Sequence, residues 1–255
     1  MDLGLAGLRA LVTGGSDGLG AAVARAVAAE GAKTAVAARA SDRLSGTAVD
    51  IGATAIPVDL STTDGPAAAV ESAVATLGGL DLVVVNSGGP PPGKFEDVSD
   101  AQWQQAIDGT LWSSIRLVRA ALPHLRNSTA PAILVILSSS VREPIQALMT
   151  SNVLRPGLAG MIKALVPEIA PVRINGIAPG RVSTARIARL DAKRAADGGV
   201  PVEEIERQTI ARIPLGRYGD PAEVGRLGAF LLSPAASYVN GAIVPVDGGM
   251  VKALP

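Results

Sequence analysis

The chain has 255 residues, of which 48% are hydrophobic, and this is enough for one large core. Basic and acidic residues both number 23, so the net charge is zero and nothing in the composition favours a nucleic-acid or acidic-surface partner. With no cysteine and a single histidine, His124, we expect no disulfide, no thiolate nucleophile and no metal site.

The chain also carries no sign of export or membrane insertion. It has no signal-like apolar stretch near its N-terminus and no uninterrupted apolar run of ~18 residues. We therefore expect a cytoplasmic protein that does not bind a membrane.

Short apolar runs alternate with helical patterns along the chain. We expect strands at 10–14, 34–39, 53–60, 80–85, 133–137, 173–177 and 242–246. Helical patterns occupy 21–29, 42–49, 66–77, 99–125, 152–169 and 221–232, with Ser99 and Asp220 as expected N-caps. Such alternation indicates βαβ units. It predicts an α/β fold: a Rossmann-type, doubly wound, about seven-stranded parallel sheet with helices on both faces. We expect a single domain over residues 1–255, with helical pieces of a substrate flap at about 183–213.

Two prolines, Pro156 and Pro167, fall within the helical pattern at 152–169. Pro156 is compatible with a helix if Asn152 caps it and the proline lies in or near the first turn. Pro167 should kink the helix.

Ligands of doubly wound sheets bind beyond the carboxyl ends of the strands, and informative residues follow these predicted ends. They are 14–20, Arg39, Asp59, 86–89, 138–140 and Pro179-Gly180. The first group, Gly14-x-x-x-Gly18-x-Gly20, joins a strand to a helix. Glycines there let the backbone approach a pyrophosphate, and the helix N-terminus supplies N–H groups.

Five motifs resemble the short-chain dehydrogenase/reductase family, in that family's order and spacing, over nearly the whole chain. They are Thr13-Gly14-x-x-x-Gly18-x-Gly20, Asp59-Leu60, Asn86-Ser87-Gly88, Pro179-Gly180 and Val246-Asp247-Gly248-Gly249. The similarity is greatest to the 3-oxoacyl-(acyl-carrier-protein) reductase-like branch. It implies an NAD(P)-binding fold, a small-molecule carbonyl or alcohol substrate, and a homo-oligomer, either a tetramer or a dimer.

The resemblance also implies where the cofactor lies. Asp59 should contact the adenine, residues 86–88 should stabilise the sheet beside the ribose, and Thr184 should contact the nicotinamide amide or a phosphate. The expected cofactor-binding residues are Gly14, Ser16, Asp17, Gly18, Leu19, Gly20, Arg39, Asp59, Leu60, Asn86, Ser87, Gly88, Arg155, Pro179, Gly180 and Thr184.

The end of the second predicted strand bears on the choice between NADP and NAD. It reads Ala37-Ala38-Arg39, and no acidic residue occupies 37–41. An acid there binds the ribose 2′-OH of NAD, whereas an arginine accommodates the 2′-phosphate of NADP. We predict NADP over NAD. Two observations weigh against this: Arg39 can be a solvated surface charge, and Asp17 stands where NADP-binding relatives often place a base.

The catalytic motif of the family is missing. Relatives use Tyr-x-x-x-Lys on a helix, a serine about 13 positions earlier and an asparagine on the preceding long helix. Here the two tyrosines, Tyr218 and Tyr238, are not followed by a lysine four residues later.

The positions of those residues follow from a neighbouring match. The segment 157–161 (GLAGM) corresponds to the residues that follow the lysine in relatives, which puts Arg155 at the lysine position and Ser151 at the tyrosine position. Ser138 lies 13 residues before Ser151, with Ser139 one residue off, and counting from Trp103 puts Thr110 at the asparagine position.

Serine is a far weaker acid than a phenol, and arginine does not deprotonate. Ser151 and Arg155 therefore cannot copy the Tyr–Lys acid/base pair. They can hold an oxyanion by hydrogen bonds and positive charge while water supplies the proton.

Three functions fit these residues. The first is an NADP(H)-dependent oxidoreductase in which Ser138 or Ser139 positions the substrate oxygen, Arg155 supplies charge near the nicotinamide ribose and Ser151 is an auxiliary hydrogen-bonding group. The second is a nucleotide-binding homologue without turnover, such as a sensor or an assembly subunit. The third is lyase-type chemistry like that of halohydrin dehalogenases. Arg155 matches their arginine, but their tyrosine is absent and the glycine motif that they have lost is present.

We considered a structural and a functional role for four further side chains. His124 is expected to be a surface or capping residue, and Tyr218 a packing residue. Arg142 either pairs with Glu143 or meets an anionic substrate. Arg181 faces the cofactor, a substrate carboxylate or solvent.

Overall fold

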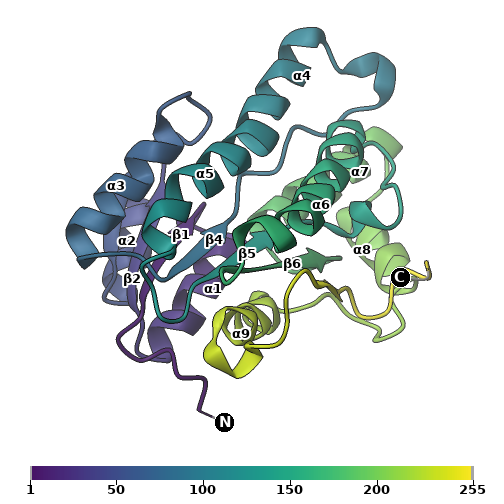
Figure 1. Cartoon of the computed structure of the whole chain (residues 1–255). Coiled ribbons are helices and arrows are strands. Elements are labelled where there is room, and N and C mark those ends of the chain that lie inside the picture. The colour runs from purple at the N-terminus through teal and green to yellow at the C-terminus, as the bar shows by residue number, and fades with distance from the viewer. Residues whose placement is uncertain (1, 254–255) are drawn as a thin grey trace.

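The computed structural model of the chain describes residues 2–253 and is built on one parallel sheet (Figure 1). The spatial order of the seven strands is β3-β2-β1-β4-β5-β6-β7. The strands are β1 (Arg9–Thr13), β2 (Lys33–Ala38), β3 (Thr54–Pro57), β4 (Leu82–Val85), β5 (Ala132–Ile136), β6 (Arg173–Pro179) and β7 (Ile243–Val246). The chain reverses its direction of travel across the sheet between β1 and β4, and this is the switch point at which such sheets bind ligands.

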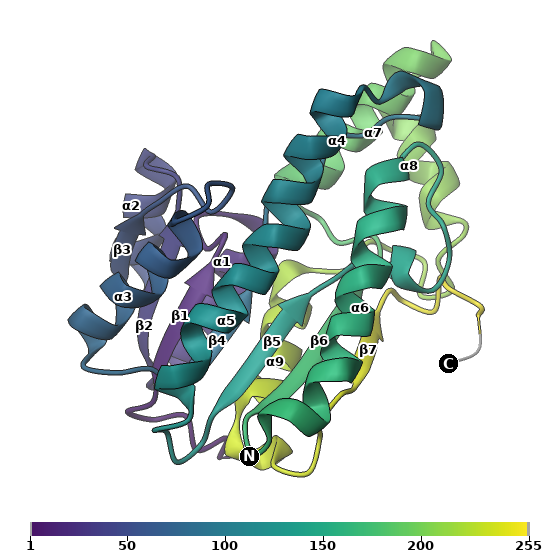
Figure 2. The same ribbon diagram turned by 45° about the horizontal axis from the view of Figure 1, so that its top comes forward.

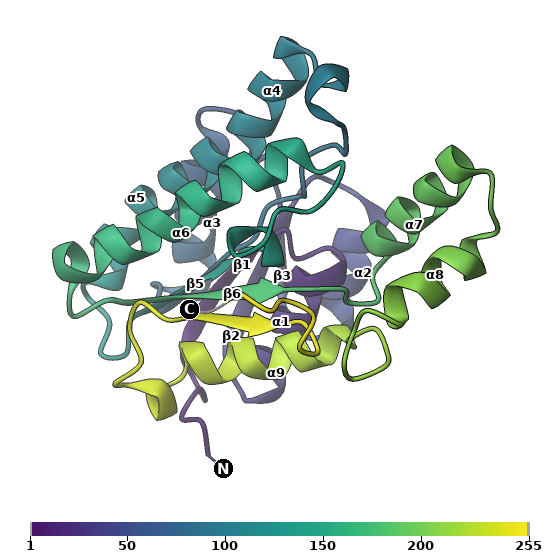
Figure 3. The ribbon, with the colours of Figure 1, turned by 90° about the vertical axis from the view of Figure 1, so that its right-hand side faces the viewer.

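Helices cover both faces of the sheet, so the molecule has three layers: helices, sheet and helices (Figure 3). One face carries α1 (Gly18–Ala29), α2 (Asp42–Asp50) and α9 (Pro221–Leu232). The other carries α3 (Gly65–Leu77), α5 (Ser113–Leu125) and α6 (Met149–Ile169). The helix α4 (Asp100–Ala106) passes through a π-helical turn, Ile107–Trp112, into α5 (Figure 2). Beyond the carboxyl ends of the strands lie α7 (Ala185–Gly198) and α8 (Val202–Ile210). No helix within 2–253 has the length and apolar character that a bilayer crossing requires.

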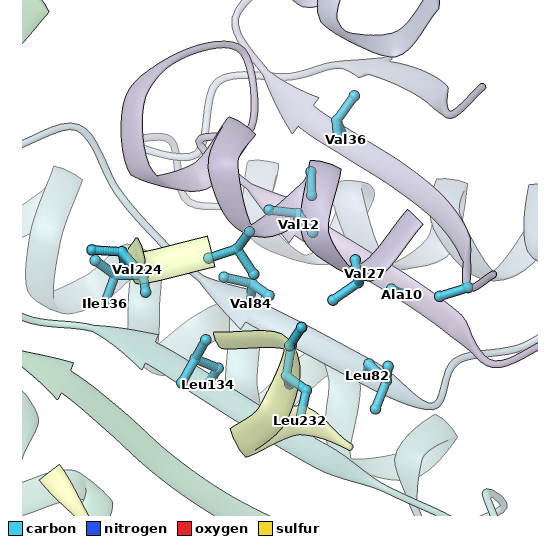
Figure 4. Packing of buried hydrophobic residues seen from close by; sticks show 14 of the residues in the cluster. Ala10, Val12, Val27, Val36, Leu82, Val84, Leu134, Ile136, Val224 and Leu232 are labelled. Atoms are coloured by element: carbon cyan, nitrogen blue, oxygen red, sulfur yellow. The ribbon is translucent and has the colours of Figure 1, made fainter. Parts of the chain in front are cut away.

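The strand side chains alternate between two cores. Val12 of β1, Val84 of β4 and Leu134 of β5 pack against Val27 of α1 and Val224 of α9 (Figure 4). The intervening residues of the same strands, such as Leu11 and Val83, join the core under α3, α5 and α6. Burial on both faces explains why these strands read as continuous apolar runs.

The predicted α/β fold and sheet are confirmed, and local sequence signals placed most elements well. Ser99 and Asp220 cap α4 and α9 with complete capping boxes. The third strand is shorter than the expected 53–60, because β2 ends at Ala38 and offers no partner beyond Val58. Asp59 instead folds back and accepts hydrogen bonds from the backbone and hydroxyl of Ser61.

The expectation that Asn152 caps the helix predicted at 152–169 is wrong. The helix α6 begins at Met149, and the Asn152 side chain bonds the backbone N–H and C=O of Ile145, both at 2.9 Å. Pro156 therefore lies in the helix interior, and α6 continues through Pro167 to Ile169. The buried face of α6, with Leu158 and Ile162 in the core, offsets the cost of the two prolines.

Asp81 joins the starting ends of three strands. Its carboxylate accepts hydrogen bonds from Nε (2.7 Å), Nη2 (2.8 Å) and the backbone N–H (2.8 Å) of Arg9. Its own backbone bonds Arg9 and Ala132, so β1, β4 and β5 begin in register. Burial alone would raise the pKa of Asp81, but hydrogen bonds from Arg9 and Ser128 outweigh it and lower the pKa.

We expect Asp81→Asn to lower the free energy of unfolding at pH 7 by about 2–3 kcal/mol, because it weakens a nearly buried bidentate pair. The control is Asp50→Asn, whose pair with Arg25 is exposed and should contribute under about 1 kcal/mol. The folded-state pKa of Asp81 lies below its unfolded value, so the contribution is present above that unfolded pKa and lost as pH falls. Urea unfolding should therefore show the difference shrinking below about pH 4. A cost that is independent of pH would contradict this assignment.

Candidate functional site

A cleft of about 1540 Å³ lies across the carboxyl ends of the strands. It is larger than the roughly 300–1,000 Å³ typical of pockets for drug-sized ligands, so it has room for an extended one. Every residue that the sequence predicted for cofactor binding or catalysis lines this cleft, with the exception of Gly20.

Gly20 closes the glycine turn. A Cβ at this position would collide with the carbonyl oxygen of Gly14 and stand 2.6 Å from Nδ2 of Asn86. That same Nδ2 donates a hydrogen bond to the Gly14 oxygen at 3.1 Å. Gly14 and Gly18 both have φ of +57°, a left-handed conformation that favours glycine. The turn is thus a side-chain-free cradle at the start of α1, and it fits the pyrophosphate of a dinucleotide.

The acidic residue in this turn has a basic partner. Asp17 caps α1 by accepting a hydrogen bond from Gly18 N at 2.6 Å, and its second oxygen lies 3.3 Å from Nη1 of Arg43. Arg39 lines the same end of the cleft, and its charge contributes, after the hydrogen bonds from Ser61, to a lowered pKa of Asp59. Arg43 was not among the residues predicted from the sequence. The available signal was its place in the first turn of α2, which follows directly on the end of β2.

The predicted catalytic residues meet on one wall of the cleft. Ser138 follows β5, and its Oγ accepts a hydrogen bond from Ser140 N at 3.1 Å, which leaves its O–H free to donate into the cleft. The hydroxyls of Ser140 and Ser151 lie 3.3 Å apart. Ser139 and Thr110 are buried at the cleft surface, Thr110 within the π-helical turn. The structure therefore brings together segments that are far apart in the sequence.

Arg155 is the charged member of this wall. Only 7% of the residue is exposed, and its Nη1 donates hydrogen bonds to the carbonyl oxygens of Ile136 and Leu137, both at 2.7 Å. Burial, followed by the charge of Arg186, lowers the pKa of Arg155 to about 10, so the guanidinium remains protonated at neutral pH. No ion pair within 2–253 includes Arg155. Its charge is therefore available to a ligand.

Residues of the flap, 183–213, are anchored by a buried carboxylate. Asp191 is fully buried and accepts hydrogen bonds from Nη1 of Arg181 at 3.1 Å and from the Tyr218 hydroxyl at 2.8 Å. Burial raises the pKa of Tyr218, and the hydrogen bond to Asp191 raises it further. Arg181 is thus committed to Asp191, and Tyr218 holds the flap in place.

The structure also places Arg142, His124 and Thr184. Arg142 is exposed and lies outside the cleft lining, and among the described residues it forms no ion pair with Glu143. Its contact with an anionic substrate stays a prediction that the lining of the cleft does not support. His124 lies in the last turn of α5, away from the cleft lining. Thr184 caps α7 by accepting from Ile187 N and faces Gly18 across the cleft.

The charges of the cleft are strongly unequal although the chain is neutral. Ten basic side chains line it: Arg39, Arg43, Lys94, Arg155, Arg181, Arg186, Arg189, Lys193, Arg194 and Arg212. Five acidic side chains do so: Asp17, Asp59, Asp97, Glu143 and Asp197. Such a cleft favours anionic ligands. Within 2–253, no three His, Asp or Glu side chains gather in a way that could hold a metal ion.

Comparisons with known proteins agree with this architecture. A family profile described as "Enoyl-(Acyl carrier protein) reductase" matches residues 14–251. The 2,5-dichloro-2,5-cyclohexadiene-1,4-diol dehydrogenase of Sphingobium indicum is 32% identical over 252 residues, which cover 96% of each chain.

Solved structures are similar over their whole length. L-sorbose reductase of Gluconobacter frateurii, complexed with NADPH and L-sorbose, has a TM-score of 0.93 and 30% identity, with 100% of both chains covered. An NADPH-bound short-chain oxidoreductase of Pseudomonas aeruginosa, described as containing an atypical catalytic center, has a TM-score of 0.86 and 30% identity over 96% of this chain and 97% of that one. The chain belongs to the short-chain dehydrogenase/reductase family.

We expect Asp191→Ala to loosen the flap, because it leaves Arg181 and Tyr218 without their buried acceptor. Limited proteolysis within 183–213 should become about 10-fold faster or more, since cleavage follows the population of the opened segment. The matched control is Asp197→Ala, which removes an exposed pair with Lys193 on the same helix and should leave the rate unchanged. Equal cleavage rates in the two variants would show that Asp191 does not anchor the flap.

Proposed function

We propose that this member of the short-chain dehydrogenase/reductase family is an NADP(H)-preferring oxidoreductase that acts on a carbonyl or alcohol substrate through a degenerate Ser/Arg site. The observation that carries the proposal is the Arg155 guanidinium, which has only neutral carbonyl partners and shares one cleft wall with Ser138 and Ser151. The similar structures described with NADPH support it, and the one described as having an atypical catalytic center supports the degenerate site.

The residues of the cleft suit a dinucleotide cofactor. The glycine turn would hold the pyrophosphate at the N-terminus of α1, with Thr184 opposite it. Arg39 and Arg43 would bind the 2′-phosphate of NADP, and the pairing of Arg43 with Asp17 reduces the repulsion that this carboxylate would exert.

The catalytic wall would act on the substrate oxygen. When bound, the cofactor supplies or accepts the hydride. Ser138 donates its O–H to the substrate oxygen; the only side-chain hydrogen bond of Ser138 among the described residues is the one that its Oγ accepts from Ser140 N. Arg155 stabilises the negative charge that develops on this oxygen during reduction. Ser139 is an alternative donor, and Ser151 is an auxiliary hydrogen-bonding group held by Ser140.

No side chain of this wall is a suitable proton donor near neutral pH, so water would supply the proton that a tyrosine gives in relatives. Loss of a positioned general acid costs typically about 10²–10⁴-fold in rate. The proposed enzyme is therefore slow, or specialised for substrates that need little acid assistance.

We also propose that residues 1–255 form one domain that works in the cytoplasm as a homo-oligomer, a tetramer or dimer. Two apolar side chains on adjacent helical segments support an interface. Trp112, at the end of the π-helical turn, is 40% exposed, and Val153 of α6 is 49% exposed.

We expect Arg39→Ala and Arg43→Ala each to weaken NADPH binding by about 10–100-fold, through the loss of charge-assisted hydrogen bonds to the 2′-phosphate. NADH, which lacks this phosphate, should bind with unchanged affinity. Fluorescence titration of both cofactors measures the effect, with Arg25→Ala on α1 as the control. A similar loss for the two cofactors would contradict recognition of the 2′-phosphate.

The decisive experiment combines cofactor titration with an NADPH-oxidation screen over aldehydes, ketones and β-ketoacyl thioesters. We expect the double variant Ser151→Tyr/Arg155→Lys to reduce carbonyl compounds about 10²–10⁴-fold faster than the natural chain, because it restores a general acid. No gain in a folded double variant that binds NADPH would contradict the assigned positions. Binding without turnover in the natural chain would favour a sensor or assembly subunit, and failure to bind NADP(H) or NAD(H) would exclude both functions.

A further inference from the structure

A second arginine, Arg186, lines the same cleft as Arg155. Arg186 lies on α7, is half-buried, and donates hydrogen bonds from Nη1 to the Gly89 oxygen (2.8 Å) and from Nη2 to the Pro90 oxygen (2.9 Å). These partners are neutral backbone carbonyls of the loop that follows β4. Arg186 thus links the flap to the opposite rim without neutralising its own charge.

Both guanidinium groups belong to the lining of this cleft. The charge on Arg186 is the second cause, after burial, of the lowered pKa of Arg155. Burial lowers the pKa of Arg186 as well, and the charge of Arg189 on the next turn of α7 lowers it further. Three like charges therefore gather at this part of the cleft.

No carboxylate within 2–253 compensates this cluster. None of the ion pairs there includes Arg155, Arg186 or Arg189. Two acids at the same cleft are engaged elsewhere: Asp17 pairs with Arg43, and Asp197 pairs with Lys193. Arg155 is buried, Arg186 is half-buried and Arg189 is exposed. A buried cation without a counter-charge is costly, and proteins retain one where a ligand supplies that charge.

The donors of Arg155 point to the same conclusion. Only Nη1 bonds to protein atoms among the described residues, which leaves Nε and Nη2 for a ligand. Arg155 lines the cleft, and no buried side-chain nitrogen or oxygen among those residues lacks a partner, so Nε and Nη2 are not sealed in the protein interior. A guanidinium edge with two parallel N–H groups matches a pair of oxygens such as those of a carboxylate.

Two anions can meet this cluster, a phosphate of the cofactor or a group on the substrate. The cofactor's phosphates have their own binding groups in the glycine turn, Arg39 and Arg43. Arg155 instead stands at the end of β5 beside Ser138, where the proposed function places the reacting oxygen.

We propose that the substrate is an anionic carbonyl compound, a 2-oxo acid or the corresponding 2-hydroxy acid, whose carboxylate is held between Arg155 and Arg186. In such a compound the carboxylate and the reacting oxygen lie on adjacent carbons, so one guanidinium edge can contact both. This substrate class rests on the proposed function, because the position of the reacting oxygen comes from it.

The test measures binding rather than turnover, so that it stays informative if hydride transfer is slow. Lactate and mandelate cannot react with NADPH-loaded protein, and their methyl esters carry no charge. We expect calorimetry to show that at least one acid binds about 10–100-fold more tightly than its ester. Arg155→Met and Arg186→Met should each abolish that preference, whereas Arg155→Lys keeps the charge and should retain part of it.

Arg126→Met, at the exposed end of α5, is the matched control and should leave the preference intact. Arg186→Met provides an independent result if Arg155→Met fails to fold. The proposal is overturned if neither acid binds better than its ester, or if the Arg186 and Arg155 variants keep the preference. It is also overturned if the acids bind only cofactor-free protein and compete with NADPH, because the arginines would then serve a cofactor phosphate.

Failure of the proposed function can be distinguished from failure of this substrate assignment. If NADPH does not bind, the same titrations on the cofactor-free protein still report whether Arg155 and Arg186 select a carboxylate.

Discussion

The interaction on which the serine-bearing wall of the cleft depends is the pair of hydrogen bonds from Arg155 to the carbonyls of Ile136 and Leu137, at the end of β5. These carbonyls are left over where the strand ends, and they satisfy one guanidinium nitrogen without neutralising its charge. The side chain is thereby held at the base of the segment that carries Ser138 and Ser140. A carboxylate in the same place would have held the arginine more strongly, but it would have removed the charge that a ligand can use.

The part of the cleft at the glycine turn depends on a different constraint, the absence of side chains. Gly20 packs against the Gly14 carbonyl, and Asn86 bonds that same oxygen, so the turn has one shape. The glycines that impose this constraint lie within a few residues of one another in the sequence. The turn could therefore be located from the sequence alone. The positions of Ser138, Ser151 and Arg155 could likewise be counted along the chain, and all three line the cleft. Capping residues such as Ser99 were predictable for the same reason, because their signals are local.

What the sequence did not reveal depends on contacts between distant segments. The length of β3 depends on where β2 ends. Asn152 has the residue type of an N-cap, but its side chain bonds the backbone of Ile145 instead. In the sequence, Arg186 is indistinguishable from the other charged residues of the flap. Nothing in the sequence indicates that α7 contacts the loop at Gly89. Net charge is misleading for the same reason. The chain is neutral overall, yet basic side chains outnumber acidic ones around the cleft, and the composition does not show where charges lie.

Ser151 and Arg155, which stand where the family resemblance predicts a tyrosine and a lysine, make physical sense as a pair. The two residues lie four apart and so share one face of α6, both buried at the cleft. A guanidinium needs more room than an ammonium group, and a serine leaves more room than a tyrosine. The hydroxyl of Ser140, at 3.3 Å, gives Ser151 the partner that a buried hydroxyl needs.

A tyrosine at 151 beside the arginine would have to compete with the guanidinium for the same part of the cleft. A lysine at 155 beside the serine would have a charge but no phenol whose pKa it could lower. Either change alone therefore removes one function without supplying another, so the two sites are expected to be coupled.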